Sequence, residues 1–233
     1  MSRWTAAAAP ALLVAALGLG LVACGGGEGD PDPGASPTSV APGPTTTTTA
    51  PDEPGALEVA VVADSEIPDE LVDALDARPD LRVTMRELHG GAPMAALDGH
   101  VDAALATDPD VLLYAGGTND LPSGPQAVLD GLAERLPRYG AGRCLVMAIP
   151  IFRYERGTPA EVAERTAGTR VLERHVRSLG AVVVSYLDVS LAMDAEGEDF
   201  FHEGELGRLH PGPQAYQRIT AALAEGIGRC PQH

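Results

Sequence analysis

The sequence predicts an α/β protein in which helices cover both faces of a five-stranded parallel sheet. Two observations lead to this prediction. Five short runs are rich in Val, Leu and Ile, and helical patterns of roughly ten to twenty residues alternate with them. Right-handed crossovers between such strands give a three-layer, doubly wound sandwich.

The predicted elements follow one another in a regular order. The expected strands are "LEVAVVA" (57–63), "LRVTMREL" (81–88), "DVLLYAGG" (110–117), "CLVMAIPI" (144–151) and "AVVVSYLDV" (181–189). The expected helices begin near Pro68, run over Met94–Leu105, Pro125–Leu136 and Pro159–Leu179, and end with a helix from Pro213 to about Ile227. In doubly wound sheets the working residues lie at the carboxyl ends of the strands, so the loops after residues 63, 87, 115, 150 and 187 are the places to search.

The N-terminal segment predicts export. Arg3 precedes the apolar run "AAAAPALLVAALGLGLVA", which is typical of a signal peptide over residues 1–23. A retained transmembrane anchor is the alternative interpretation of this run. The following "LVAC" resembles a lipobox, the signal of bacterial lipoproteins, so Cys24 is the expected lipid anchor at the outer face of the cell membrane.

Residues 24–55 are dominated by Gly, Pro, Thr and acidic residues and predict a disordered tether. Residues 56–233 form the expected single domain, large enough to bury a core. Of the 16 basic residues only Arg3 lies in residues 1–23, so the rest of the chain carries 15 basic against 33 acidic residues, a formal charge of −18. This charge argues against nucleic acid as a partner.

Two cysteines remain once Cys24 is assigned to lipid. Cys144 opens the fourth predicted strand, and Cys230 ends a helix of about 16 residues, which at roughly 24 Å is long enough to cross the sheet layer. Both should reach the amino-terminal edge of the sheet, which predicts a Cys144–Cys230 disulfide in an exported protein. Two buried free thiols are the alternative.

Four polar blocks stand at the predicted loops: "VVADSEIP", "LHGGAPM", "YAGGTNDL" and "LHPGPQAY". With these blocks the chain resembles the SGNH, or GDSL-type, hydrolases over essentially the whole of residues 56–229. The resemblance implies a flavodoxin-like sheet of order 2-1-3-4-5 and a serine esterase mechanism.

The resemblance assigns roles to residues in the first three blocks. Ser65 matches the nucleophile, and Asp64 supports it within the block usually written Gly-Asp-Ser. Asn119 and the backbone amides of Ser65 and Gly91 match the oxyanion hole, with Gly90 as the alternative to Gly91. Gly117 belongs to the tight turn before Asn119. A helix cap at Asp64 or Ser65 and plain turn glycines are the structural alternatives.

His210 matches the general base, but the family's Asp-x-x-His-Pro pattern has Gly207 at the acidic position. Three alternatives follow. Glu205, or else Glu203 or Asp199, reaches His210 from a shifted loop; a backbone carbonyl takes its place; or the site has lost its activity.

Glu66 adds a second departure, because a negative charge beside the nucleophile opposes oxyanion formation. The repulsion is relieved if the Glu66 side chain turns to solvent or to an arginine such as Arg153 or Arg156, and the sequence leaves both positions open. Ala63 stands where Gly is usual. His89 and His202 match no metal motif, so neither a metal nor a cofactor is expected.

These observations predict an exported, monomeric esterase acting on O-acyl esters of envelope glycans or on small esters. The alternatives are an SGNH-fold lipoprotein that binds a glycan or acyl ligand without turnover, and an O-acyltransferase that uses the same residues. Apart from the ester substrate, the membrane reached through Cys24 is the only expected partner.

Overall fold

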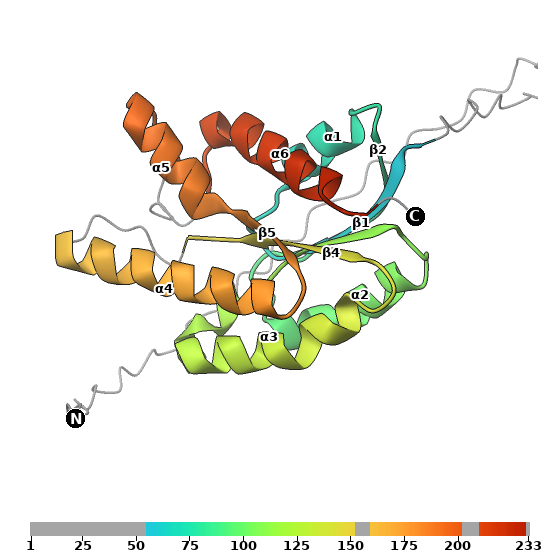
Figure 1. The fold of residues 1–233 in the computed structure, drawn as a ribbon, viewed down its shortest axis with the longest axis horizontal. Coiled ribbons are helices and arrows are strands. Elements are labelled where there is room, and N and C mark those ends of the chain that lie inside the picture. Colours follow the sequence, from blue (N-terminus) through green and yellow to red (C-terminus); the bar gives the residue numbers. More distant parts are fainter. Residues whose placement is uncertain (1–54, 152–158, 202–209, 232–233) are drawn as a thin grey trace, which may run out of the picture. The chain divides into compact units, whose positions relative to one another are not determined.

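The computed structural model describes residues 55–151, 159–201 and 210–231 (Figure 1). Five parallel strands form one sheet of order β2-β1-β3-β4-β5, as the sequence predicts. The strands are β1 (Leu57–Ala63), β2 (Leu81–Leu88), β3 (Val111–Ala115), β4 (Cys144–Ile149) and β5 (Val182–Ser185). The helices are α1 (Asp69–Asp76), α2 (Met94–Leu105), α3 (Pro125–Tyr139), α4 (Pro159–Ser178), α5 (Tyr186–Glu196) and α6 (Pro213–Gly228), with a 3₁₀ helix η1 (Thr118–Ser123) after β3.

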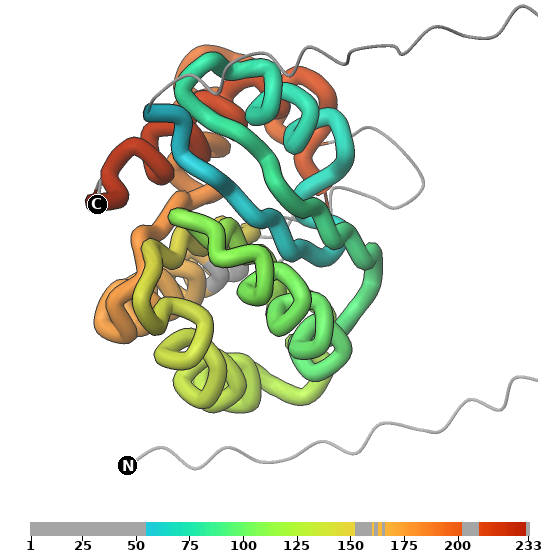
Figure 2. The backbone as a smooth tube through the Cα atoms, turned by 90° about the vertical axis from the view of Figure 1, so that its right-hand side faces the viewer, coloured from blue at the N-terminus to red at the C-terminus, as the bar shows by residue number. Residues whose placement is uncertain are grey.

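The sheet lies between two layers of helices. In Figure 1, α1, α5 and α6 cover one face and α2, α3 and α4 cover the other, and the view in Figure 2 shows the central strands between the two layers. The alternation of side chains along β1 supplies both cores, because Val59 and Val61 pack toward one layer while Ala60 and Val62 pack toward the other. All four are fully buried, as expected of a strand covered on both faces.

The sheet register brings the ends of three strands together. Ala63, the last residue of β1, is paired with Leu88 of β2 on one side and with Ala115 of β3 on the other. Because the strands are parallel, the loops that follow them leave from one edge of the sheet. Three of the four polar blocks therefore start side by side.

The fifth predicted strand is too long. The run 181–189 contains β5 over only Val182–Ser185, and α5 begins at Tyr186. The Ser185 hydroxyl accepts a hydrogen bond of 3.1 Å from the Asp188 amide and so caps this helix. Tyr186, Leu187, Ser190 and Met193 then bury one face at helical spacing.

The predicted disulfide is confirmed. Cys144 and Cys230 are bonded, with their Cα atoms 5.7 Å apart, at the amino-terminal edge of β4. The bond ties the end of the C-terminal helix to the sheet. A cross-link of this kind typically contributes about 2 to 4 kcal/mol to stability.

The predicted signal peptide, Cys24 and nearly all of the tether lie outside the described residues. Within residues 55–151, 159–201 and 210–231, no helix has the length and apolar character needed to cross a membrane.

Candidate active site

The candidate site is assembled at the carboxyl ends of β1 and β3. The Asp64 amide donates a hydrogen bond of 3.0 Å to the Ala115 carbonyl, and the His89 amide donates one of 2.8 Å to the Ala63 carbonyl. These bonds extend the strand pairing by one step on each side of β1. They fix the chain immediately before Ser65.

Ser65 and His210 face each other across 145 residues of sequence. His210 Nε2 lies 2.8 Å from Ser65 Oγ, within hydrogen-bonding distance, and both residues are half-buried. A nucleophilic hydroxyl and an imidazole at this separation meet the geometric requirement for general-base activation. The sequence predicts this pair, and the structure brings it together.

Two contacts hold the backbone around His210. Phe201 forms an antiparallel bridge with Pro211, and the Gly212 amide donates a hydrogen bond of 2.8 Å to the Phe200 carbonyl. Phe200 and Phe201 are buried in the core. The position of His210 is therefore set from the core just before α6 begins at Pro213.

The residues predicted to orient His210 fall mostly outside the described part. Glu203, Glu205 and Gly207 lie outside it. Asp199 lies within it, and its carboxylate accepts a hydrogen bond of 3.1 Å from the Phe201 amide. Asp199 thus contributes to the turn that leads to the Phe201–Pro211 bridge.

Asn119 lies in η1, and Gly117 is the N-cap residue directly before η1. Gly117 has a φ of 110°, a conformation that favours glycine. Asn119 Nδ2 donates hydrogen bonds of 3.2 Å both to Asp64 Oδ2 and to the Ala92 carbonyl. The amide therefore lies beside the nucleophile block, and it must exchange one of these bonds to donate to a substrate oxygen.

The two glycines of the second block differ in their surroundings. Gly91 has a φ of 78°, and a Cβ built on it would meet no atom within 4 Å. A Cβ built on Gly90 would lie 3.8 Å from the Ser65 Cβ. Gly90 is thus the glycine packed against the serine, while Gly91 makes the turn.

Asp64 links the first and third blocks. Its Oδ1 accepts a hydrogen bond of 3.1 Å from the Glu66 amide, while its Oδ2 accepts the bond from Asn119. Burial raises the pKa of Asp64 from its ordinary value of 3.8 to about 6; the two amide donors oppose this rise, and the charge of Asp120 adds to it. The carboxylate holds both the serine turn and the Asn119 amide in place.

The sequence left two positions open for the Glu66 side chain, and the structure excludes the first of them. The side chain does not turn to solvent, because only 3% of the residue is exposed. Burial, and then the charge of Asp64, raise the pKa of Glu66 well above its ordinary value. This shift favours the neutral form of the carboxyl, which weakens the repulsion on an oxyanion that the sequence suggested. Arg153 and Arg156 lie outside the described residues.

Asp120 is a supporting residue to which the sequence analysis assigned no role. Its Oδ2 accepts a hydrogen bond of 2.9 Å from the Met94 amide, the first residue of α2. An acidic side chain at a helix N-terminus satisfies a free amide and interacts favourably with the helix dipole. The signal was present in the "GGTND" block as a second polar residue directly after Asn119.

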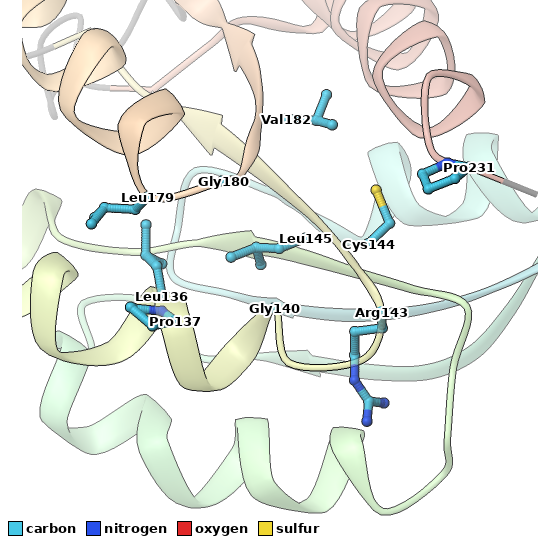
Figure 3. Close-up of a pocket in the computed structure, with 10 residues that line it drawn as sticks. All are labelled: Leu136, Pro137, Gly140, Arg143, Cys144, Leu145, Leu179, Gly180, Val182 and Pro231. Carbon is cyan, nitrogen blue, oxygen red and sulfur yellow. The ribbon is translucent and has the colours of Figure 1, made fainter.

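A separate hollow of about 280 Å³ lies at the opposite edge of the sheet (Figure 3). Leu136, Leu145 and Leu179 line it together with Cys144, whose sulfur is in the disulfide, and Arg143 is the only charged residue among the described residues that line it. These described residues include no pair of nucleophile and base. Ser65, paired with His210, is therefore the candidate site of hydrolysis, and this hollow is not.

Within the described residues, one cluster has the composition of a metal site. Glu87, His89 and His100 place three potential ligand atoms within 4.8 Å of one another. The three residues come from a strand, a turn and a helix and match no short motif, so the sequence gives no signal of their convergence.

Comparison with known families agrees with the geometry. The model of the GDSL-like lipase/acylhydrolase family matches residues 58–218. The chain belongs to this family. The match includes Ser65, Asn119 and His210. Comparison with curated protein sequences gave no match.

Solved structures of GDSL-family proteins share the fold. A member of the lipolytic G-D-S-L family from Veillonella parvula aligns with a TM-score of 0.59 at 14% identity, covering 75% of this chain and all of the other. A lipase/acylhydrolase from Enterococcus faecalis gives 0.58 at 14% identity, over 76% and 98% of the two chains. An acetylxylan esterase from Geobacillus stearothermophilus gives 0.57 at 15% identity, over 75% and 95%.

Proposed function

We propose that this GDSL-family protein is a serine esterase in which Ser65 is the nucleophile and His210 the general base. The observation that carries the proposal is the 2.8 Å separation of Ser65 Oγ and His210 Nε2. A serine hydroxyl is a weak nucleophile at neutral pH, and a hydrogen-bonded imidazole activates it by accepting its proton.

The reaction proceeds by acyl transfer in two halves. Ser65 Oγ attacks the ester carbonyl while its proton passes to His210 Nε2, which gives a tetrahedral oxyanion. The C–O bond to the alcohol then breaks, and His210 returns the proton to the leaving oxygen. Water, deprotonated by His210, attacks the acyl-enzyme and releases the carboxylic acid.

The proposed oxyanion donors are the amides of Ser65 and Gly91 and the side chain of Asn119. In the resting site Asn119 Nδ2 is bonded to Asp64 and to the Ala92 carbonyl. We propose that the substrate oxygen takes over one of these protons while the other bond keeps the amide in place. Asp64 then acts as a positioning residue that does not itself touch the substrate.

The group that orients His210 is proposed from the sequence. Glu205 is the first choice for the acidic partner, and a backbone carbonyl is the alternative. In serine proteases, changing the acidic partner to an amide lowers turnover by about 10⁴. If Glu205 has this role, Glu205→Gln lowers kcat strongly; an unchanged kcat would assign the role to a carbonyl.

We further propose that the enzyme is exported, anchored through Cys24, and acts on O-acyl esters of envelope glycans. The acidic chain argues against polyanionic partners. The acetylxylan esterase from Geobacillus stearothermophilus, which shares the fold, supports acetylated glycans as the first substrate class to test. Small esters are the second.

The test measures the rate at which the parent chain and Ser65→Ala hydrolyse p-nitrophenyl acetate and acetylated xylan. Hydrolysis that is lost in Ser65→Ala, with an unchanged melting temperature, supports the proposal. Equal rates with both chains would refute it. Absence of hydrolysis in the parent chain would favour the ligand-binding lipoprotein, and acetylated sugar among the products would favour the transferase.

A further inference from the structure

A carboxylate and two imidazoles converge outside the Ser65–His210 pair. Glu87 Oε2 lies 2.8 Å from His89 Nε2 and 2.9 Å from His100 Nδ1. The two imidazole rings are in contact, with centroids 3.6 Å apart and planes tilted by 31°. Two nitrogens are thus directed at one carboxylate oxygen.

Strand pairing and a backbone hydrogen bond fix the main chain at Glu87 and His89. Glu87 lies near the end of β2, where it is in register with Val62 of β1. His89 comes two residues later, and its amide is bonded to the Ala63 carbonyl at 2.8 Å. Residues two apart in an extended chain lie on the same side, which explains why the side chains of Glu87 and His89 meet. His100 comes from α2.

We propose that Glu87, His89 and His100 bind one Zn²⁺ ion. Two imidazole nitrogens and one carboxylate oxygen are a donor set that zinc accepts, and three protein ligands leave a fourth position for water. The proposal does not depend on the esterase activity, because none of the three side chains is assigned to that chemistry.

The spacing of the donor atoms suits a small ion after a modest adjustment. Zinc bonds of about 2.0 to 2.2 Å in a tetrahedral site place ligand atoms about 3.3 to 3.5 Å apart. The two nitrogens must therefore move away from Glu87 Oε2 by about 0.5 Å, and they must also reach this separation from each other, starting from within 4.8 Å. The exposed fractions of the side chains are 26% for Glu87, 34% for His89 and 39% for His100, so an ion can enter from solvent.

The proposed site adjoins the turn of the second block. The His89 carbonyl accepts a hydrogen bond of 3.0 Å from the Ala92 amide, and the Ala92 carbonyl accepts the bond from Asn119. Gly90, between them, packs against Ser65. An ion held by His89 would therefore fix one end of the turn that contacts both the serine and Asn119.

Isothermal titration with ZnCl₂ tests the proposal. The protein used in the titration carries the substitution Cys24→Ala. Because Cys144 and Cys230 are joined in a disulfide, this variant has no free thiol that competes for zinc. It carries no histidine tag and is first freed of metal by a chelator. We expect one Zn²⁺ per chain, and one Co²⁺ with the visible absorption of a tetrahedral site. Absence of zinc binding at millimolar concentration would overturn the proposal.

Two variants locate the ion. His100→Ala, at a half-buried position of α2, should weaken zinc binding by at least tenfold, since loss of even an outer partner of a metal ligand commonly costs 10- to 100-fold. His175→Ala is the matched control: His175 lies on α4 and its Nε2 contacts the Leu129 carbonyl at 3.1 Å, so zinc binding should be unchanged. Equal affinity in the parent and His100→Ala would overturn the assignment. If circular dichroism shows that His100→Ala is unfolded, His100→Gln carries the same test.

Discussion

Replacing Asp64 by Asn removes a buried charge while nearly preserving the shape of the side chain. Asp64 is 1% exposed, and burial raises its pKa from 3.8 to about 6. The folded protein therefore binds this proton more tightly than the unfolded chain, so Asp64 makes the protein less stable as the pH rises from about 4 to about 6. Two pKa units at 1.36 kcal/mol each give a cost of about 3 kcal/mol above that window.

Asp64→Asn avoids the cost of burying this charge, but it loses the carboxylate oxygen that accepts the hydrogen bond from Asn119. A hydrogen bond to a charged group is worth about 1.5 to 3 kcal/mol. The net effect at one pH is thus small, and the change with pH is the informative quantity. Relative to the parent, we expect Asp64→Asn to gain about 2 to 3 kcal/mol between about pH 4 and about pH 7.5. In Asp64→Asn the charge of Asp64 no longer raises the pKa of Glu66, and this change adds to the expected gain in stability with rising pH.

Urea unfolding at a series of pH values measures this difference. Asp130→Asn is the control, because it removes one charge from the exposed surface of α3. The esterase rate of Asp64→Asn should fall at the same time, since Asn119 loses one of its two anchors. Stability curves of the parent and of Asp64→Asn that stay parallel from about pH 4 to about pH 7.5 would refute the reasoning.

Three further predictions concern other parts of the molecule. Asn119→Ala should lower kcat by about 10² to 10³, the usual effect of losing one oxyanion donor, with a smaller change in KM in steady-state kinetics; an unchanged kcat would remove Asn119 from the mechanism. The Cys144→Ala, Cys230→Ala double variant should lose about 2 to 4 kcal/mol in urea unfolding, and a reducing agent should destabilise only the parent. Gly117→Ala should lose about 1 to 2 kcal/mol because its φ of 110° disfavours a side chain; a stability equal to that of the parent would show that the turn can adjust.

The fold was predictable because hydrophobic periodicity and chain order determine most of it. Five buried runs separated by helical patterns leave few arrangements for a parallel sheet. The disulfide followed from the same geometry, since Cys144 starts a strand and Cys230 ends a helix that returns to that edge. The exception was the run 181–189, where the Ser185 cap starts a helix within a stretch that has strand composition.

The pairing of Ser65 with His210 was predictable from motif resemblance, and the burial of Glu66 was not. Glu66 follows the serine, where a turn residue is commonly exposed, yet the turn directs it into the interior. Its backbone carbonyl accepts a hydrogen bond of 3.2 Å from Tyr186, 120 residues away. The convergence of Glu87, His89 and His100 is also tertiary, because α2 brings His100 back over the end of β2.

The central claim is that Ser65 becomes acylated with His210 as its base. Rapid quenching of the reaction with p-nitrophenyl acetate, followed by intact mass spectrometry, tests it most directly. We predict that the parent gains the mass of one acetyl group, that peptide mapping places the group on Ser65, and that Ser65→Ala gains none while His210→Ala acylates far more slowly. An acetyl group on another residue, or equal acylation of the parent and Ser65→Ala, would contradict the account.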